Sequence, residues 1–145
     1  LRQYFSSGDK GVFALRGNYG SALGSEPPVY EAFRVGGADT VRGYLEDRWY
    51  GMNRLLVSAE YRYQISGHSA RSGIQLVLFA DYGDAYGGRW ASQDGSILFA
   101  EHQTFQGSLG YGLGVRVNTP LGPIRLDYGI GSEGGRTHFG ISQTF

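Results

Sequence analysis

Two short stretches of the sequence contain residue types that could do covalent or cofactor chemistry, but neither has the spacing that this chemistry needs. The segment GHSAR, residues 67–71, begins like the G-x-S-x-G turn that exposes a nucleophilic serine, yet Arg71 stands where the second glycine belongs. The segment GYGLG, residues 110–114, lacks the G-x-G-x-x-G spacing of a dinucleotide-binding turn. The three histidines are too scattered to indicate metal ligands. We therefore predict that the protein is not an enzyme and needs no metal or other cofactor.

One arginine lies in surroundings that indicate ion pairing with carboxylates. Arg42 lies in FRVGGADTVRGY, residues 33–44, among large apolar residues and the glycines Gly36 and Gly37. The segment belongs to a connection of about thirty residues, 21–50, which is much longer than connections usually are. Its apolar residues indicate that the connection packs against another part of the chain. A buried guanidinium without a partner costs several kcal/mol, so Arg42 needs carboxylates.

The composition of the chain narrows the class of protein to which it can belong. The chain has 145 residues, enough for one domain, and equal numbers of basic and acidic residues, 13 each, so no nucleic-acid partner is expected. Cysteine is absent, which excludes disulfides and thiol chemistry. The chain contains 25 glycines and 14% aromatic residues, and this aromatic content argues against disorder. The longest apolar run, near residues 76–80, is far shorter than the roughly 20 residues of a membrane helix.

Apolar and polar residues alternate with a period of two over several long segments. In residues 53–65, NRLLVSAEYRYQI, the odd positions are apolar and the even positions are polar except Leu56. The other segments with an apolar face and a polar face are 11–19, 73–86, 105–117, 124–130 and 138–145. Because side chains alternate between the two faces of a strand, we predict six antiparallel strands over these ranges, with residues 1–5 as the end of a seventh.

The length of these strands and the chemistry of their faces favour a membrane barrel. Strands of soluble sandwiches are near 5–6 residues long. A polar face of arginine, carboxylates and glycine is typical of a barrel lumen, and an apolar face with aromatic residues is typical of a lipid-facing surface. Short connections also alternate with longer ones, as in outer-membrane barrels. Residues 21–50, 87–104 and 131–137 are predicted on the outer side. A soluble, lipocalin-like barrel is the alternative.

Six strands and part of a seventh cannot close a membrane barrel, because single-chain barrels begin at eight strands. An open sheet would leave two edges with unpaired backbone groups. The predicted fold class is therefore all-β, a portion of an antiparallel transmembrane β-barrel of about six to eight strands with a long loop folded into its lumen. We expect residues 1–145 to form one such segment, closed by further strands or by a second copy in a homodimer.

The polar faces of the next two strands along the chain offer Arg42 its partners. Glu60 and Asp81 both point to the predicted lumen, and a guanidinium can bridge two carboxylates with forked hydrogen bonds. Three inward glycines in residues 105–117 leave room for a segment that crosses the lumen. The alternative is that Arg42 is a solvated loop charge and that the two loop glycines form a simple turn.

The same residues carry a family likeness. The segment FRVGGADTVRGY, with its tip Val41, Arg42, Gly43 and Tyr44, resembles the loop motif of the superfamily of outer-membrane protein insertases and two-partner-secretion transporters, the group containing BamA, TamA and FhaC. SAEYRY, LFADYGDAY and the ending GVRVNTPLGPIRLDYGIG…GGRTHFGISQTF are similar to that family's barrel strands. The likeness covers essentially the whole chain and corresponds to the C-terminal barrel portion, without a POTRA domain.

The resemblance implies a structure and a function. In that family the loop arginine contacts acidic residues that map onto Glu60 and Asp81. The C-terminal aromatic strand is the signal by which such barrels are recognised for insertion, which here indicates Phe139, Ile141 and Phe145. The implied location is a bacterial outer membrane. The implied partners are the lipid bilayer and either client β-barrel proteins or a secreted substrate, and the implied activity is the assembly or insertion of outer-membrane proteins.

Two other functions stay open on the sequence alone. A short member of the family could pair with itself and act as a pore or a structural protein. Alternatively, the barrel could anchor or translocate a secreted passenger, since some barrels of this family carry an N-terminal patatin-like phospholipase.

Overall fold

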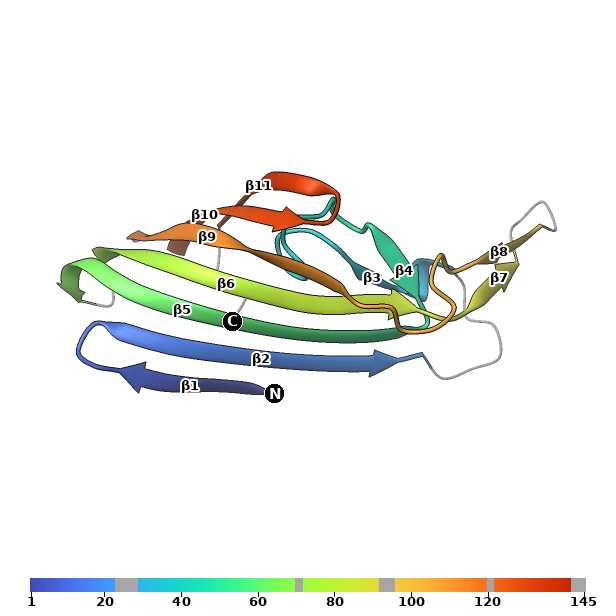
Figure 1. Ribbon diagram of the computed structural model, residues 1–145, viewed down its shortest axis with the longest axis horizontal. Helices are drawn as coiled ribbons and strands as arrows, with labels where there is room; N and C mark the ends of the chain where they lie inside the picture. The colour runs from blue at the N-terminus through green and yellow to red at the C-terminus, as the bar shows by residue number, and fades with distance from the viewer. Residues whose placement is uncertain (23–28, 70–71, 92–95, 120–121, 142–145) are drawn as a thin grey trace.

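A computed structural model describes residues 1–22, 29–69, 72–91, 96–119 and 122–141. Its main feature is one antiparallel sheet of seven strands in the order β1-β2-β5-β6-β9-β10-β11 (Figure 1). The strands of this sheet are β1 (Arg2–Ser7), β2 (Gly11–Ser21), β5 (Asn53–Ser69), β6 (Ser72–Tyr86), β9 (Ser108–Thr119), β10 (Gly122–Gly131) and β11 (Gly134–Ile141). The predicted all-β class and the predicted six strands with part of a seventh are confirmed.

Several predicted strand boundaries of this sheet are wrong. β9 begins at Ser108 and not at residue 105. Residues 131–137 do not form a connection, because β10 continues to Gly131 and β11 begins at Gly134, so that Ser132 and Glu133 alone form the turn. Glycines at the start of β11 have no side chains, so the alternation was invisible there. The last strand is described to Ile141, and Phe145 lies outside the described residues.

The sheet is open. Within the described residues, β1 pairs with β2 alone and β11 pairs with β10 alone. The arrangement is therefore that of a partial barrel, as the strand count predicted. The turn from β1 to β2 and the start of β6 lie at one end of the sheet, and a small hairpin of β7 (Arg89–Ala91) and β8 (Ile97–Phe99) projects beyond the other end (Figure 1).

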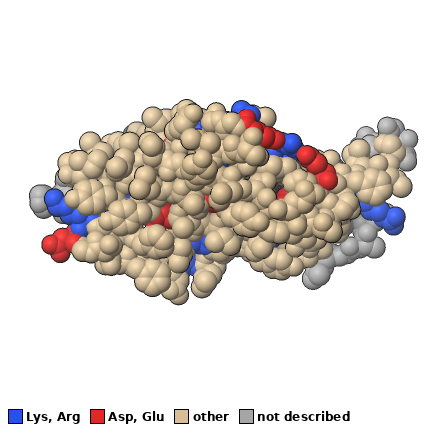
Figure 2. Space-filling view, in the orientation of Figure 1, with Lys and Arg blue, Asp and Glu red and all other residues tan. Residues whose placement is uncertain are grey.

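The two faces of the sheet differ as the alternation predicted. The outward side chains are apolar, and Leu78, Leu113 and Leu126 are each about half exposed, at 53%, 52% and 51%. Figure 2 shows that charged side chains gather towards the two ends of the molecule and that a mostly uncharged surface lies between them. The inward side chains include buried carboxylates and arginines. Within the described residues, no helix is long and apolar enough to cross a membrane.

The long connection after β2 is a folded segment packed on the inner face of the sheet. It contains a short 3-10 helix, η1 (Val29–Glu31), and the antiparallel pair β3 (Phe33–Val35) and β4 (Trp49–Gly51). Four of its apolar residues form a buried cluster with two residues of the sheet, and this cluster comprises Val35, Val41, Tyr44, Trp49, Leu56 and Ala85. Burial of these side chains stabilises the loop against the seven-stranded sheet, which forms the wall of the partial barrel. It also explains why the loop sequence is so apolar.

Candidate functional site

The Arg42 guanidinium lies at the centre of a buried cluster of charges. Its Nε and Nη2 donate to the two oxygens of Asp81 at 2.7 and 2.9 Å, which is the forked geometry that arginine makes with a carboxylate. Its Nη1 donates to Glu60 at 2.7 Å and to Asp127 at 3.3 Å. The Arg42 side chain is 3% exposed and the three carboxylates are 1% exposed or less. One loop residue is thus bound to three strands, β5, β6 and β10.

Two wall arginines complete the cluster. Arg62 Nε donates to Glu60 at 2.8 Å, and Arg116 Nη2 donates to Asp127 at 3.0 Å, with a second ion-pair contact from Arg116 Nη1 to the same carboxylate. Three arginines therefore face three carboxylates, so the buried charge is balanced.

Arg42 also stays charged in this environment. Burial alone would lower the pKa of Arg42, but the hydrogen bonds and charge of Asp81, with the charges of Glu60 and Asp127, raise this pKa above its ordinary value. The guanidinium carbon lies 3.6 Å from the centre of the Phe79 ring, which adds a cation–π contact. The charged Arg42 guanidinium, bonded to three carboxylates, thus clamps the loop to the sheet.

The other tip residues bind further strands. The Gly43 N–H donates to Nε2 of His138 on β11 at 3.0 Å. The Tyr44 hydroxyl lies 3.0 Å from the backbone oxygen of Leu109 on β9 and 3.0 Å from the backbone N–H of Ser132, which donates to it in the turn between β10 and β11. Val41 is fully buried. The four-residue tip therefore contacts five consecutive strands of the sheet, from β5 to β11.

Glycines of the wall give the tip its space. A Cβ on Gly110 of β9 would overlap the Arg42 carbonyl oxygen, and a Cβ on Gly129 of β10 would lie 2.6 Å from the Gly43 nitrogen. Gly43 itself has a φ of 97°, a conformation that other residues rarely adopt. Of the three inward glycines of residues 105–117, Gly110 thus leaves space for the loop tip, whereas Gly112 and Gly114 lie against Tyr128 and Asp127 of β10.

The loop glycines form the bend that leads to the tip. Gly36 and Gly37 have φ angles of 118° and 98°. A Cβ on Gly36 would collide with the Leu45 carbonyl oxygen, and one on Gly37 would collide with the Glu46 carboxylate. Gly36 is therefore required by packing as well as by backbone conformation, and Gly37 by backbone conformation, so the segment is more than a simple exposed turn.

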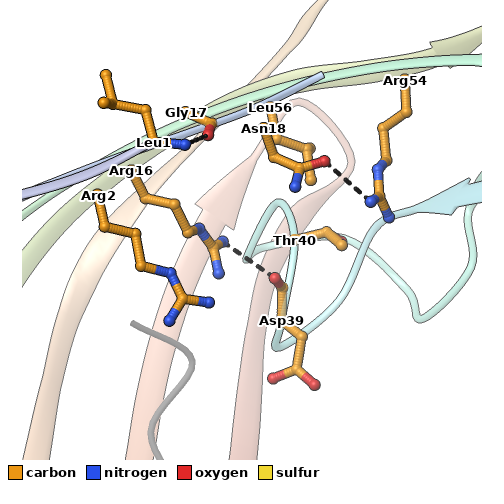
Figure 3. A pocket seen from close by; sticks show the side chains of 9 residues that line it. All are labelled: Leu1, Arg2, Arg16, Gly17, Asn18, Asp39, Thr40, Arg54 and Leu56. Carbon is orange, nitrogen blue, oxygen red and sulfur yellow. Dashed lines mark hydrogen bonds between the residues drawn. The ribbon is translucent and has the colours of Figure 1, made fainter. Parts of the chain in front are cut away.

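A pocket lies where the loop meets the first two strands of the sheet (Figure 3). Arg16 donates to the Asp39 carbonyl oxygen at 3.0 Å, and Arg54 donates to the Asn18 side chain at 2.9 Å. Of the bonds drawn there, the one from Arg16 joins the sheet to the loop, whereas the bond between Arg54 and Asn18 lies within the sheet. The Arg16 contact fixes the loop on the side of the sheet opposite to the His138 contact.

The outer end of the molecule has a second, exposed arginine cluster. Arg48, which follows the loop tip, donates from Nη1 to Glu101 at 2.6 Å and from Nε to Glu133 at 2.7 Å. Glu101 belongs to the connection between β6 and β9, and Glu133 belongs to the turn between β10 and β11. Hydrogen bonds to both glutamates raise the pKa of Arg48, and the bond from Arg48 lowers the pKa of Glu101. Arg48 thus joins three external segments.

The predicted site residues fall into two groups. Arg42, Glu60 and Asp81 meet in the charge cluster, whereas Phe139 and Ile141 lie on the outward face of β11, 64% and 63% exposed, and do not contribute to it. The role of these two residues in recognition stays a prediction.

Sequence reasoning missed Asp127, Arg116, Arg62 and His138. The alternation had already placed Asp127 on the polar face of residues 124–130, so a signal for it was present. Within the described part of the chain, no set of histidines and carboxylates is arranged to hold a metal ion.

Comparison with known proteins places the chain among relatives. The family model of the Omp85 superfamily domain matches residues 1–145. Outer envelope protein 80, chloroplastic, of Arabidopsis thaliana is 38% identical over 133 residues, covering 90% of this chain and 17% of the relative. Protein TOC75, chloroplastic, of Pisum sativum is 32% identical over 127 residues, covering 86% and 14%.

A bacterial relative gives a similar match. Outer membrane protein assembly factor BamA of Neisseria meningitidis serogroup B is 29% identical over 146 residues, covering 81% of this chain and 18% of the relative. The chain therefore spans less than a fifth of the length of each of these three relatives.

Proposed function

The chain belongs to the Omp85 superfamily, and we propose that it is the C-terminal part of an outer-membrane β-barrel that takes part in assembling or inserting other β-barrel proteins. This agrees with the names of its relatives, which include an outer membrane protein assembly factor and chloroplast outer envelope proteins. The proposed role needs no covalent chemistry. It needs a wall that stays in shape and an edge that can accept another strand.

The observation that carries the proposal is the clamp between the loop tip and the wall. The V-R-G-Y tip makes buried contacts with β5, β6, β10 and β11 and a partly buried one with β9, so that it touches the last five strands of the open sheet. A protein that only formed a pore would gain little from a loop that fills its lumen. A wall fixed from inside up to its last strand is suited to presenting that strand to a partner.

The proposed mechanism is strand addition at β11. Within the described residues this strand is paired on one side only, by β10. Its other side carries backbone donors and acceptors that an extended client strand could bond, which is recognition by β-augmentation. The partners proposed are therefore unfolded β-rich clients, or a secreted substrate that passes along the same edge.

The proposed location is an outer membrane, with the apolar face of the sheet against lipid. Exposed leucines and tyrosines on β6, β9 and β10 support this, since such a surface would be unfavourable in water. A bacterial outer membrane is the specific proposal. The chloroplast relatives make fractionation of the source cells the direct test of which outer membrane it is.

Reconstitution tests the proposed activity. The complete protein that contains this chain is placed in liposomes, an unfolded barrel client is added, and folding is followed by the change in gel mobility without heating. We expect faster client folding than in empty liposomes, and inhibition by a peptide with the sequence of the client's last strand but not by a scrambled peptide. Equal folding rates with and without the protein would refute the proposal.

The open sheet also supports a second candidate, a self-associating barrel. Both β1 and β11 have one unpaired side among the described residues, so two copies could pair edge to edge. The mass of the purified protein in detergent separates the two candidates. A single dimeric species would favour self-association, and a monomeric complete protein would exclude it.

A further inference from the structure

We infer that His138 is a positioning residue that ties the loop tip to the last strand only while its imidazole is neutral. The inference deepens the proposed function and rests on it for its biological meaning. It begins with two measured contacts of a side chain that is 8% exposed. His138 Nε2 lies 3.0 Å from the Gly43 nitrogen, and His138 Nδ1 lies 3.8 Å from Glu46 Oε1.

The first contact fixes which ring nitrogen carries the proton. The Gly43 N–H is a donor, so Nε2 must present its lone pair and the ring hydrogen must be on Nδ1, on the side of Glu46. A second proton would have to enter at Nε2. It would then face the Gly43 N–H, so that two donors would oppose each other and the hydrogen bond would be lost.

The charges around the ring act in both directions. The charged groups that face the ring are two carboxylates, Glu46 of the loop and Asp127 of β10, and two guanidinium groups, Arg42 of the tip and Arg125 of β10. Asp127 is already bonded by two arginines of the cluster. Histidine is the side chain that ordinarily changes charge between pH 5 and pH 8, so modest acidification is the natural way to protonate this ring.

Protons can reach the ring from solvent. His138 lines a pocket together with Leu45, Glu46 and Arg136, and Glu46 is 67% exposed. The pocket lies between the loop and β11, the strand that within the described residues pairs with β10 alone. A change in protonation there acts on the proposed client-accepting strand.

The consequence for Gly43 is definite. Its N–H points into a buried site, and a glycine is required there because a Cβ would lie 2.8 Å from the backbone of Ile130 and Gly131. With no room to turn away, the N–H would be left without an acceptor once His138 is protonated, which is costly for a buried donor. The tip then loses its hydrogen bond to β11, so that strand is held less firmly while the Arg42 cluster keeps the tip on β5, β6 and β10.

Amide hydrogen exchange tests the tie without requiring any client. Exchange of the peptide that contains Gly43 is measured in the complete protein in lipid, at pH 7.5 and pH 4.5, and divided by the intrinsic rate at each pH. In the wild type we expect protection to fall roughly fivefold to tenfold at the lower pH, the size of one lost hydrogen bond. His138→Gln, whose amide oxygen can accept, keeps protection at both pH values, and His138→Leu loses it at both.

A control variant and a second readout make the result decisive. His102→Gln is the control variant. His102 lies in the connection between β6 and β9 and bonds Asp84 of β6, so this change should leave the pH effect at Gly43 intact. The inference is overturned if His138→Leu protects Gly43 as the wild type does, or if His138→Gln retains the wild-type pH effect. Client folding in liposomes, measured in parallel, should be lowered severalfold by His138→Leu and restored by His138→Gln.

The two proposals fail in different ways. If exchange at Gly43 behaves as expected but neither the wild type nor any variant accelerates client folding, the role of His138 is supported and the proposed function is wrong. If the wild type accelerates client folding and exchange at Gly43 ignores His138, the function stands and the tie is wrong.

Discussion

Arg42 and Arg48 do the same chemistry in two different environments. Each arginine joins carboxylates that are distant in the sequence: Arg42 binds Glu60, Asp81 and Asp127, and Arg48 binds Glu101 and Glu133. The Arg42 side chain is 3% exposed and the Arg48 side chain is 28% exposed. The bond lengths are alike, so geometry does not distinguish the two clusters. Burial does.

The difference teaches that the inner cluster cannot be opened one residue at a time. Removing one partner of a buried ion pair leaves an uncompensated buried charge, which typically costs about 3–5 kcal/mol. Exposed ion pairs contribute about 0–1 kcal/mol, because water solvates the partners when they part. The inner clamp is therefore expected to be permanent, and the outer cluster to open and close readily.

The largest effect is expected at Arg42. Arg42→Ala leaves three buried carboxylates with too few cations, and we expect the free energy of unfolding to fall by about 3–5 kcal/mol. The measurement is urea unfolding in detergent, followed by gel mobility without heating. Arg34→Ala is the matched control, since Arg34 is a loop arginine 52% exposed with its own partner, Asp47, and its loss should cost less than about 1 kcal/mol. Equal effects at the two arginines would remove the distinction between buried and exposed clusters.

A somewhat smaller effect is expected from the wall glycine that accommodates the tip. Gly110→Val places side-chain atoms where the Arg42 carbonyl oxygen lies, so we expect a loss of about 1–3 kcal/mol from overpacking. Gly17→Val in β2 is the control, because nothing lies within 4 Å of a Cβ there. The same unfolding measurement applies. A Gly110 variant as stable as the Gly17 variant would mean that the tip does not rest on β9.

The smallest effect is expected at Arg48, and it should depend on salt and pH. Arg48→Ala should cost less than about 1 kcal/mol at pH 7 in low salt and nearly nothing in 1 M salt. Because Arg48 lowers the pKa of Glu101 below its ordinary 4.5, this contribution is fully present above pH 4.5 and is lost as pH falls through the lowered value. Thermal unfolding of the two proteins at pH 7 and pH 3 measures it. A difference that persists at pH 3 would contradict the assignment.

Much of the fold could be predicted from the sequence because a strand shows its two faces in alternate residues. That pattern revealed the long strands and put Glu60 and Asp81 on the same face as the loop that carries Arg42. The alternation could not be recognised at glycines, which have no side chain, as at Gly134 and Gly135. The short strands β3, β4, β7 and β8 have three residues each, too few for an alternation to be recognised.

The other contacts of the site depend on how the strands are aligned with one another, which a single sequence does not reveal. Asp127 lies 85 residues from Arg42, and it reaches the guanidinium only because β10 pairs with β9 and β9 pairs with β6. The partners of Arg48 lie 53 and 85 residues away in external segments without any periodic pattern. The scattered histidines show no metal-ligand spacing that would single out His138. The partner of His138 is a backbone N–H, which no side-chain motif could indicate.

A double-mutant cycle between Arg42 and Asp81 tests the central claim, that the loop tip is clamped to the wall by buried charge, most directly. The free energy of unfolding is measured for the wild type, Arg42→Ala, Asp81→Asn and the double variant. The forked contact predicts that the double variant loses about 1–3 kcal/mol less than the sum of the two single losses, since the second change removes a group whose partner is already gone. Losses that add within about 0.5 kcal/mol would show that the two side chains do not interact, and would contradict the clamp.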